Sequence, residues 1–173
     1  MAKKSAGLLL YREASETLGI KVLLAHPGGP FWRNKNEGAW TIPKGEFADD
    51  EDPLAAAKRE FEEELGAAPP VGDYIQLKPI KQKNGKVVHA WAVKGNFDPK
   101  ALKSNTFEME WPPKSGRMQS FPEVDRAQWF SPDVAKLKML IGQGALVDEL
   151  TERLANTSPL ATILNRKSET KND

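Results

Sequence analysis

The chain contains no cysteine, which excludes disulfide bonds, thiol nucleophiles and zinc sites built on thiolates. Long apolar runs are also missing, and no stretch approaches the ~18 apolar residues that a membrane-spanning helix requires. The apolar run that follows Met-Ala-Lys-Lys-Ser at the N-terminus is too short for the core of a signal peptide. We therefore expect a soluble, cytoplasmic protein.

The chain also lacks an excess of charge of one sign. Its 25 basic and 24 acidic residues give a formal net charge of +1. This balance does not favour a nucleic-acid polymer or an anionic membrane as a partner. A length of 173 residues suffices for one domain with a core and is short for two. We expect a single domain over residues 1–166 and a polar, disordered tail over 167–173.

Acidic residues are concentrated in residues 45–67, which read GEFADDEDPLAAAKREFEEELGA. Glu60, Glu63 and Glu64 are spaced i, i+3 and i+4, so on a helix they share one face within roughly 100°. Like charges at this spacing repel one another by a few tenths of a kcal/mol. A helix that carries such a cluster is expected to bind a cation. Oxygen ligands favour a hard cation such as Mg²⁺ or Mn²⁺.

The same stretch carries the signals of a loop that leads into a helix. Asp52 is a suitable N-cap, and Pro53 at the first helical position sacrifices no hydrogen bond. Gly66 stands where a left-handed glycine commonly ends a helix. Residues 40–42 are predicted to form a short strand that feeds a turn at 43–45. The acids therefore belong to a predicted strand–loop–helix unit.

This stretch resembles the signature of the Nudix hydrolases. That signature consists of a glycine, five residues, a glutamate, seven residues, Arg-Glu, an apolar residue, one residue, Glu-Glu, one residue, a glycine and an apolar residue. Every fixed position is filled between Gly45 and Ala67. The alternative is a solvated, charge-rich helix, but accidental agreement has a chance of roughly one in 10⁸ per starting point. The resemblance implies an α/β fold, the Nudix α/β/α sandwich with a mixed β-sheet.

The resemblance also implies a reaction. Nudix enzymes hydrolyse a nucleoside diphosphate linked to another moiety, with Mg²⁺ or Mn²⁺ assisting the attack of water on phosphorus. It assigns metal ligation to the three helical glutamates, Glu60, Glu63 and Glu64. The backbone carbonyl of Lys44 is a further expected ligand.

The position of the general base differs among family members, so the sequence leaves a choice between the signature helix and a distal glutamate. The distal candidate is Glu123, in a segment (FPEVDRAQWF) similar to a loop-to-strand stretch of the family. Glu123 is therefore predicted as a metal ligand or base, with Asp125 as the alternative. The signature arginine, Arg59, is expected to orient the glutamates with help from Glu51, unless both form only a surface salt bridge.

Candidate substrate contacts lie in two loops. Lys44 occurs in Trp-Thr-Ile-Pro-Lys-Gly, which is similar to a motif of Nudix enzymes acting on dinucleoside or inositol polyphosphates. A lysine there can hold a phosphate as a point charge. Lys114 and Arg117, in a predicted basic loop over 112–120, are candidates for distal phosphates or are only solubilising. Trp32 is the candidate for stacking on a base.

The leading prediction is a metal-dependent hydrolase of dinucleoside polyphosphates such as diadenosine tetraphosphate. The alternatives are pyrophosphohydrolysis of free or damaged nucleoside triphosphates, or of nucleotide sugars. A non-catalytic, nucleotide-sensing module is disfavoured because no signature acid is missing. An isomerase of isoprenyl diphosphates would normally use a cysteine. The leaving group, the number of metals and the oligomeric state are left open.

Periodicity predicts the remaining elements. The expected strands are 6–11, 20–25, 74–81, 87–93, 106–111 and 127–130, with a hairpin at Asn84-Gly85. The expected helices, besides the one that carries the acids, are 132–139 and 144–154. Residues 27–39 are predicted to form a loop.

Overall fold

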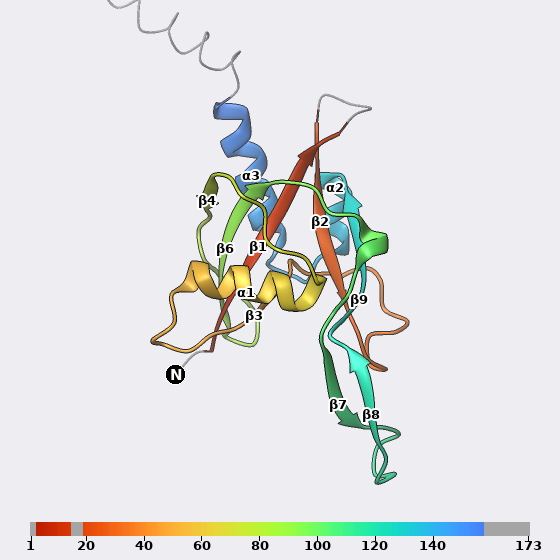
Figure 1. Ribbon diagram of the computed structural model, residues 1–173. Coiled ribbons are helices and arrows are strands. Elements are labelled where there is room, and N and C mark those ends of the chain that lie inside the picture. The colour runs from red at the N-terminus through yellow and green to blue at the C-terminus, as the bar shows by residue number, and fades with distance from the viewer. Residues whose placement is uncertain (1–2, 15–18, 158–173) are drawn as a thin grey trace, which may run out of the picture.

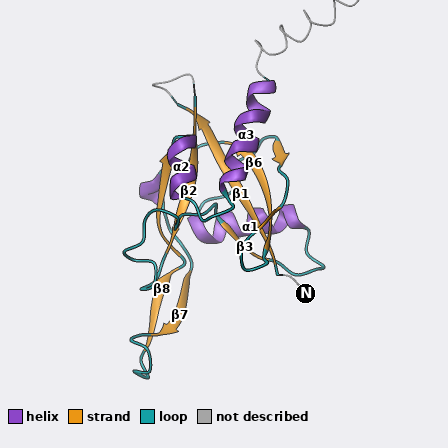
Figure 2. Ribbon diagram, turned by 180° about the vertical axis from the view of Figure 1, so that it is seen from behind, coloured by secondary structure: helices purple, strands orange, loops and turns teal. Residues whose placement is uncertain are grey.

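The computed structural model describes residues 3–14 and 19–157. The helix α1 (Pro53–Leu65) crosses one face of a twisted sheet (Figure 1). The helices α2 (Pro132–Lys138) and α3 (Gly144–Asn156) cover the opposite face, as the view from behind shows (Figure 2). The predicted α/β/α sandwich is therefore confirmed. The expected tail over 167–173 lies outside the described residues.

The sheet is mixed. Its strands are β1 (Lys4–Glu13), β2 (Ile20–Pro27), β3 (Lys44–Glu46), β4 (Tyr74–Gln76), β5 (Ile80–Lys81), β6 (Val87–Lys94) and β9 (Val124–Phe130). The main order is β4-β6-β1-β2-β9, with β3 paired to β1 and β5 to β6. The pair β1–β6 is parallel and the other pairs are antiparallel. A short 3-10 turn, η1 (Pro99–Ala101), follows β6.

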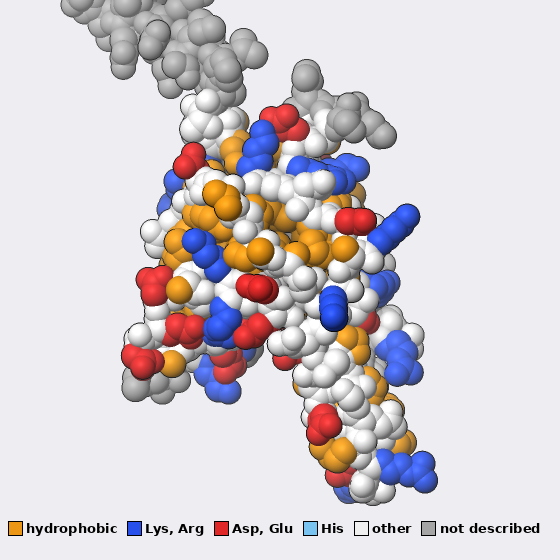
Figure 3. All heavy atoms as spheres, viewed as in Figure 1, with side chains coloured by type: hydrophobic (Ala, Val, Ile, Leu, Met, Phe, Trp, Pro, Cys, Tyr) orange, Lys and Arg blue, Asp and Glu red, His pale blue; other side chains and the backbone are white. Residues whose placement is uncertain are grey.

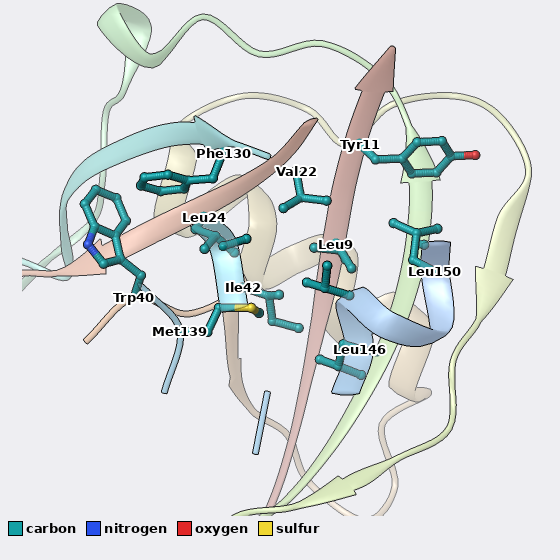
Figure 4. Close-up of a cluster of buried hydrophobic side chains, with 14 of the residues drawn as sticks. Leu9, Tyr11, Val22, Leu24, Trp40, Ile42, Phe130, Met139, Leu146 and Leu150 are labelled. Atoms are coloured by element: carbon teal, nitrogen blue, oxygen red, sulfur yellow. The ribbon is translucent and has the colours of Figure 1, made fainter. Parts of the chain in front are cut away.

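The central strand β1 supplies both cores. Because side chains alternate along a strand, Leu8 and Leu10 face α1 while Leu9 and Tyr11 face α2 and α3. Figure 4 shows Leu9 in the core that faces α2 and α3, close to Leu146 of α3. A strand covered on both faces is apolar throughout, which explains its unbroken apolar run. Within the described residues, no helix is long and apolar enough to cross a membrane.

Two strands stand apart from the sheet. β7 (Thr106–Glu110) and β8 (Met118–Pro122) form an antiparallel hairpin that projects from the body of the molecule (Figure 1). The sequence prediction of a loop over 112–120 was wrong for the part that forms β8. Most side chains of β8 are exposed, so the strand has no apolar alternation that a sequence pattern could reveal.

Two other predictions need correction. Residues 74–81 form β4 and β5 rather than one strand, and Pro79, which has no N–H to donate, lies between them. Residues 40–42 make only isolated bridges, Thr41 to Ala25 and Trp40 to Met139. The strand that precedes α1 is instead β3, which begins at Lys44.

Candidate active site

The helix α1 has the ends that its sequence predicts. The side chain of Asp52 accepts a hydrogen bond from the N–H of Ala55 at 2.9 Å. Gly66 adopts a left-handed φ of 76° and closes the helix with an N–H to the carbonyl of Glu62. Phe61 and Leu65 are buried in the core beneath the helix. These contacts fix which face of α1 carries the acids.

Glu60 is buried against β3, with only 8 % of its surface exposed. A Cβ placed on Gly45 would overlap the carboxylate of Glu60, so only glycine allows this close approach of helix and strand. Burial raises the pKa of Glu60, Arg59 opposes that rise, and the charges of Glu63 and Glu123 add to it. The glycine of the signature therefore makes room for an acid in a dry position.

Arg59 connects three of the acids. Its Nε and Nη2 donate to the two carboxylate oxygens of Glu51 at 2.9 and 3.2 Å. Its Nη1 donates to Glu60 at 2.8 Å and more weakly to Glu63 at 3.4 Å. A two-point contact with one acid fixes the plane of the guanidinium, which then positions the other two carboxylates.

Glu64 points towards the strand rather than towards Arg59. Its carboxylate accepts a hydrogen bond from the backbone N–H of Lys44 at 3.1 Å. Burial and the charge of Glu60 together raise the pKa of Glu64 to about 8, against an opposing effect of Lys44. The pKa of the Lys44 ammonium is lowered by burial and by the nearby charge of Lys86, which forms an ion pair with Glu46 at 2.9 Å.

Lys86 is a residue that sequence reasoning missed. It lies in a lysine-rich turn, and only the pairing of distant strands brings it beside Lys44. No local pattern distinguishes it from Lys81 or Lys83.

Glu123 joins the same cluster from the base of the β7–β8 hairpin. Its N–H donates to the carbonyl of Asn105 and its carbonyl accepts from Gly28, at 2.8 and 2.9 Å. The N–H of Asn105 in turn donates to the carbonyl of Glu63 on α1 at 2.8 Å. Burial raises the pKa of Glu123, and the charge of Glu63 adds to the effect. The distal acid and the helical acids therefore influence one another electrostatically.

The carboxylates are not grouped as a finished metal site. Across residues 3–14 and 19–157, no three acidic or histidine side chains are placed as ready ligands. Arg59 holds the carboxylates of Glu60 and Glu63, and Glu64 is bonded to the Lys44 amide. The donors are all carboxylate oxygens, which suit Mg²⁺ and Mn²⁺. A cation therefore fits this donor set chemically and would take over carboxylates that are now held by Arg59 and the backbone.

Asp125, the alternative to Glu123, is engaged elsewhere. Its Oδ1 lies 2.7 Å from Nδ1 of the fully buried His26, whose Nε2 lies 2.6 Å from the carbonyl of Lys35. A carbonyl only accepts, so Nε2 carries a proton. Asp125 and His26 thus hold the loop over 28–39 against β9.

The remaining candidates lie further along the loops. Lys114 and Arg117 fall between the end of β7 and the start of β8, at the far tip of the hairpin, where Figure 3 shows basic side chains. Both are exposed, and the structure does not bring them to the glutamates. Trp32 is partly buried against the core and lines a cavity of about 370 Å³.

Comparisons with known proteins bear on the family and the fold of the chain. A family model described as the NUDIX domain matches residues 1–150. The Nudix domain of Shewanella oneidensis NrtR, solved with ADP ribose, superposes with a TM-score of 0.60 at 20% identity, covering 89% of each chain. A binary complex of C. elegans Ap4A hydrolase gives 0.60 at 23%, covering 88% of this chain and 98% of that one. No curated protein sequence matches the chain.

The M. smegmatis Nudix hydrolase RenU gives a TM-score of 0.55 at 21% identity and covers 90% of this chain and 87% of that one. At such identities the structural matches show the fold alone, whereas the family model covers most of the chain.

Proposed function

The chain belongs to the Nudix family of hydrolases, and we propose that it is a Mg²⁺-dependent enzyme that cleaves dinucleoside polyphosphates at a phosphoanhydride bond. Mn²⁺ is the alternative ion. The observation that carries the proposal is the cluster of Glu60, Glu63, Glu64 and Glu123, in which burial first, and then the charges of neighbouring acids, raise the pKa values of Glu60, Glu64 and Glu123. Buried like charges at this density are costly without a cation.

Each acid has a proposed role. Glu60, Glu63 and Glu64 would hold the divalent ion, with the carbonyl of Lys44 as a further ligand. When bound, such an ion would neutralise phosphate charge and lower the pKa of a bound water. The residues of the chain set the geometry, since phosphoryl transfer depends mainly on positioning and charge stabilisation.

Proton transfer is assigned to Glu123. The backbone of Glu123 is hydrogen-bonded to Asn105 and to Gly28. These two bonds restrain the Cα from which its carboxylate reaches the edge of the cluster. Burial raises its pKa, which favours a proton acceptor that works nearer neutral pH than an exposed glutamate does. Glu60 is the alternative base, and Arg59 is proposed as a positioning residue because it donates to the carboxylate of Glu60.

Lys44 supports a substrate rich in phosphate. It adjoins Glu64, and Lys86 adds a second cation beside it. The likeness in fold to an Ap4A hydrolase supports the same class. We propose that Lys114 and Arg117 contribute less than Lys44, because they lie at the far tip of the hairpin.

A panel of nucleotides tests the proposal. Purified protein with Mg²⁺ is given diadenosine tetraphosphate, nucleoside triphosphates and nucleotide sugars, ADP-ribose among them, and the products are separated by ion-exchange chromatography. We expect the highest kcat/KM for diadenosine tetraphosphate, loss of activity with EDTA and recovery with Mg²⁺ or Mn²⁺. A preference for triphosphates or for nucleotide sugars would overturn the substrate assignment, and binding without turnover of any compound would indicate a sensing module.

A further inference from the structure

A cavity at the far end of β1 lies away from the acid cluster. Its volume is about 340 Å³, within the range of roughly 300–1,000 Å³ that is usual for ligand pockets. Lys44 pairs with β1 at Gly7, whereas Arg12 lies five residues further along that strand, or about 17 Å at about 3.4 Å per residue. Figure 1 shows the end of β1 on one side of α1 and β3 on the other. We call this cavity the Arg12 pocket; it is lined by Arg12, Glu13, Ala14, Lys21 and Asn96.

Two cations face each other across neighbouring strands in the Arg12 pocket. Arg12 on β1 is the direct register partner of Lys21 on β2, so the two side chains leave the same face of the sheet. Both are half-buried, and within residues 3–14 and 19–157 neither forms an ion pair with a carboxylate. Like charges placed directly opposite each other destabilise a strand pair. The pair is therefore expected to gain from a bound anion.

Glu13 also lines the pocket, but its charge is neutralised by another residue. Its carboxylate accepts a hydrogen bond from Nζ of Lys94 on β6 at 2.9 Å. Because side chains alternate along a strand, Glu13 leaves β1 on the face opposite to Arg12. Among the described residues, the pocket thus keeps two positive charges that no carboxylate balances.

Two contacts fix the guanidinium of Arg12. Its Cζ lies 4.2 Å from the centroid of the Trp129 ring, and its Nη1 donates to Oδ1 of Asn96 at 2.8 Å. The Trp129 indole is itself held, since its Nε1 donates to the carbonyl of Phe97 at 2.9 Å. The Nε and Nη2 donors of Arg12 are not used in these contacts. An arginine oriented in advance loses little side-chain freedom when a ligand binds.

We propose that the Arg12 pocket binds a phosphate group, separately from the acid cluster. The guanidinium of Arg12 matches the spacing of phosphate oxygens, Lys21 adds a point charge, and the amide of Asn96 can donate to a further oxygen. A phosphate group carries a charge of about −1.5 to −2 at neutral pH, which balances both cations, whereas a carboxylate balances one. The site requires no divalent ion and does not rest on the proposed function.

Titration calorimetry of the full chain with inorganic phosphate tests the site. EDTA removes divalent ions, and low ionic strength limits the screening of charge. We expect the wild-type protein to bind phosphate and Lys21→Gln to weaken that binding at least about 5-fold, because a charge-assisted hydrogen bond is lost. Arg12→Gln should weaken it at least as much. Acetate, with a single charge, should not displace the phosphate.

Two control variants separate the pocket from other lysines. Lys81→Gln changes an exposed strand lysine outside the pocket and should bind phosphate like the wild type. Lys86→Gln changes a cation near the acid cluster and should also bind normally. No phosphate binding by the wild type would overturn the proposal. Unchanged binding by Lys21→Gln together with a loss in Lys86→Gln would do the same, because the phosphate would then lie beside Lys44.

Thermal unfolding gives an independent readout with a predicted sign. Without phosphate, Lys21→Gln should keep or raise the Tm, because it removes the repulsion from Arg12. Phosphate should raise the Tm of the wild type and not that of Lys21→Gln, and equal rises in both would contradict the site. Ribose 5-phosphate identifies the source of the group. If Lys21→Gln weakens its binding too, the pocket accepts phosphorylated molecules; if only inorganic phosphate is affected, the pocket is a site for the free ion.

Discussion

The helix α1 and the β7–β8 hairpin differ in how firmly the fold holds them. α1 packs on β1, β3 and β6, and its two ends are closed by Asp52 and Gly66. The hairpin contacts chiefly itself, and its strands expose most of their side chains. A two-stranded hairpin without further support is only marginally stable in water.

This difference in stability matches the proposed division of roles, in which α1 carries the metal ligands and the hairpin carries the base and the outer phosphate contacts. The acids that must be positioned within fractions of an ångström lie on a rigid helix, as catalytic groups generally require. Glu123 belongs to the anchored base of the hairpin, where hydrogen bonds to Asn105 and Gly28 restrain it. Lys114 and Arg117 occupy the free tip. We therefore expect effects of mutation to decline from the helix to the base and then to the tip.

The largest effect is expected at Glu64. Glu64→Gln should lower kcat by several orders of magnitude, because it removes a charged ligand while it leaves the helix folded. Glu62→Gln is the matched control, since Glu62 lies on the same helix and is exposed. The rates are measured with diadenosine tetraphosphate and Mg²⁺, and circular dichroism checks the fold. Near wild-type turnover by Glu64→Gln would remove it from the ligand set.

The anchored base of the hairpin comes next. Glu123→Gln should lower kcat far more than it raises KM, because the lost group acts in the transition state and not in substrate binding. Glu110→Gln, on the exposed strand β7, is the control. An effect confined to KM, or no effect, would assign the base to the signature helix, with Glu60 as the candidate.

The contrast between helix and hairpin also explains which elements the sequence predicts and which it does not. The signature spacing, the cap at Asp52 and the glycine at 66 are local features, so they predicted the helix α1 and its ends correctly. Strand β8 was missed because exposed strands lack apolar alternation. Lys86 and the cavity beside Trp32 were missed because they arise where distant segments meet, which no local pattern encodes.

A smaller effect is expected at Arg59. Arg59→Lys keeps the positive charge but loses the two-point contact with Glu51, so Glu60 and Glu63 are held less firmly. We expect kcat to fall roughly 10–100-fold, as is typical when a partner of metal ligands is altered. The apparent affinity for Mg²⁺ should weaken in parallel. Lys58→Arg, a charge-conserving change one residue earlier on α1, serves as the control.

Stability should depend on pH through Glu64. Its pKa is raised from 4.5 to about 8 in the folded state, so the folded protein retains a proton that the unfolded chain releases. The free energy of unfolding should therefore fall as the pH rises from about 4.5 to about 8 in EDTA. Glu64→Gln should flatten that slope in urea titrations, and Glu62→Gln should not. An equal slope in both variants would contradict the assignment.

The smallest effect is expected at the hairpin tip, where Lys114 and Arg117 lie, and Lys44 on β3 is the reference for it. Lys44→Ala should remove most of the preference for tetraphosphate over diphosphate substrates, because Lys44 adjoins Glu64. The double variant Lys114→Ala/Arg117→Ala should change KM by less than Lys44→Ala does and leave kcat unaltered. The measurement is kcat and KM for substrates with two, three and four phosphates. If the tip variant removes the preference as fully as Lys44→Ala, the hairpin must bend towards the acids when substrate binds, and its free tip would then belong to the site.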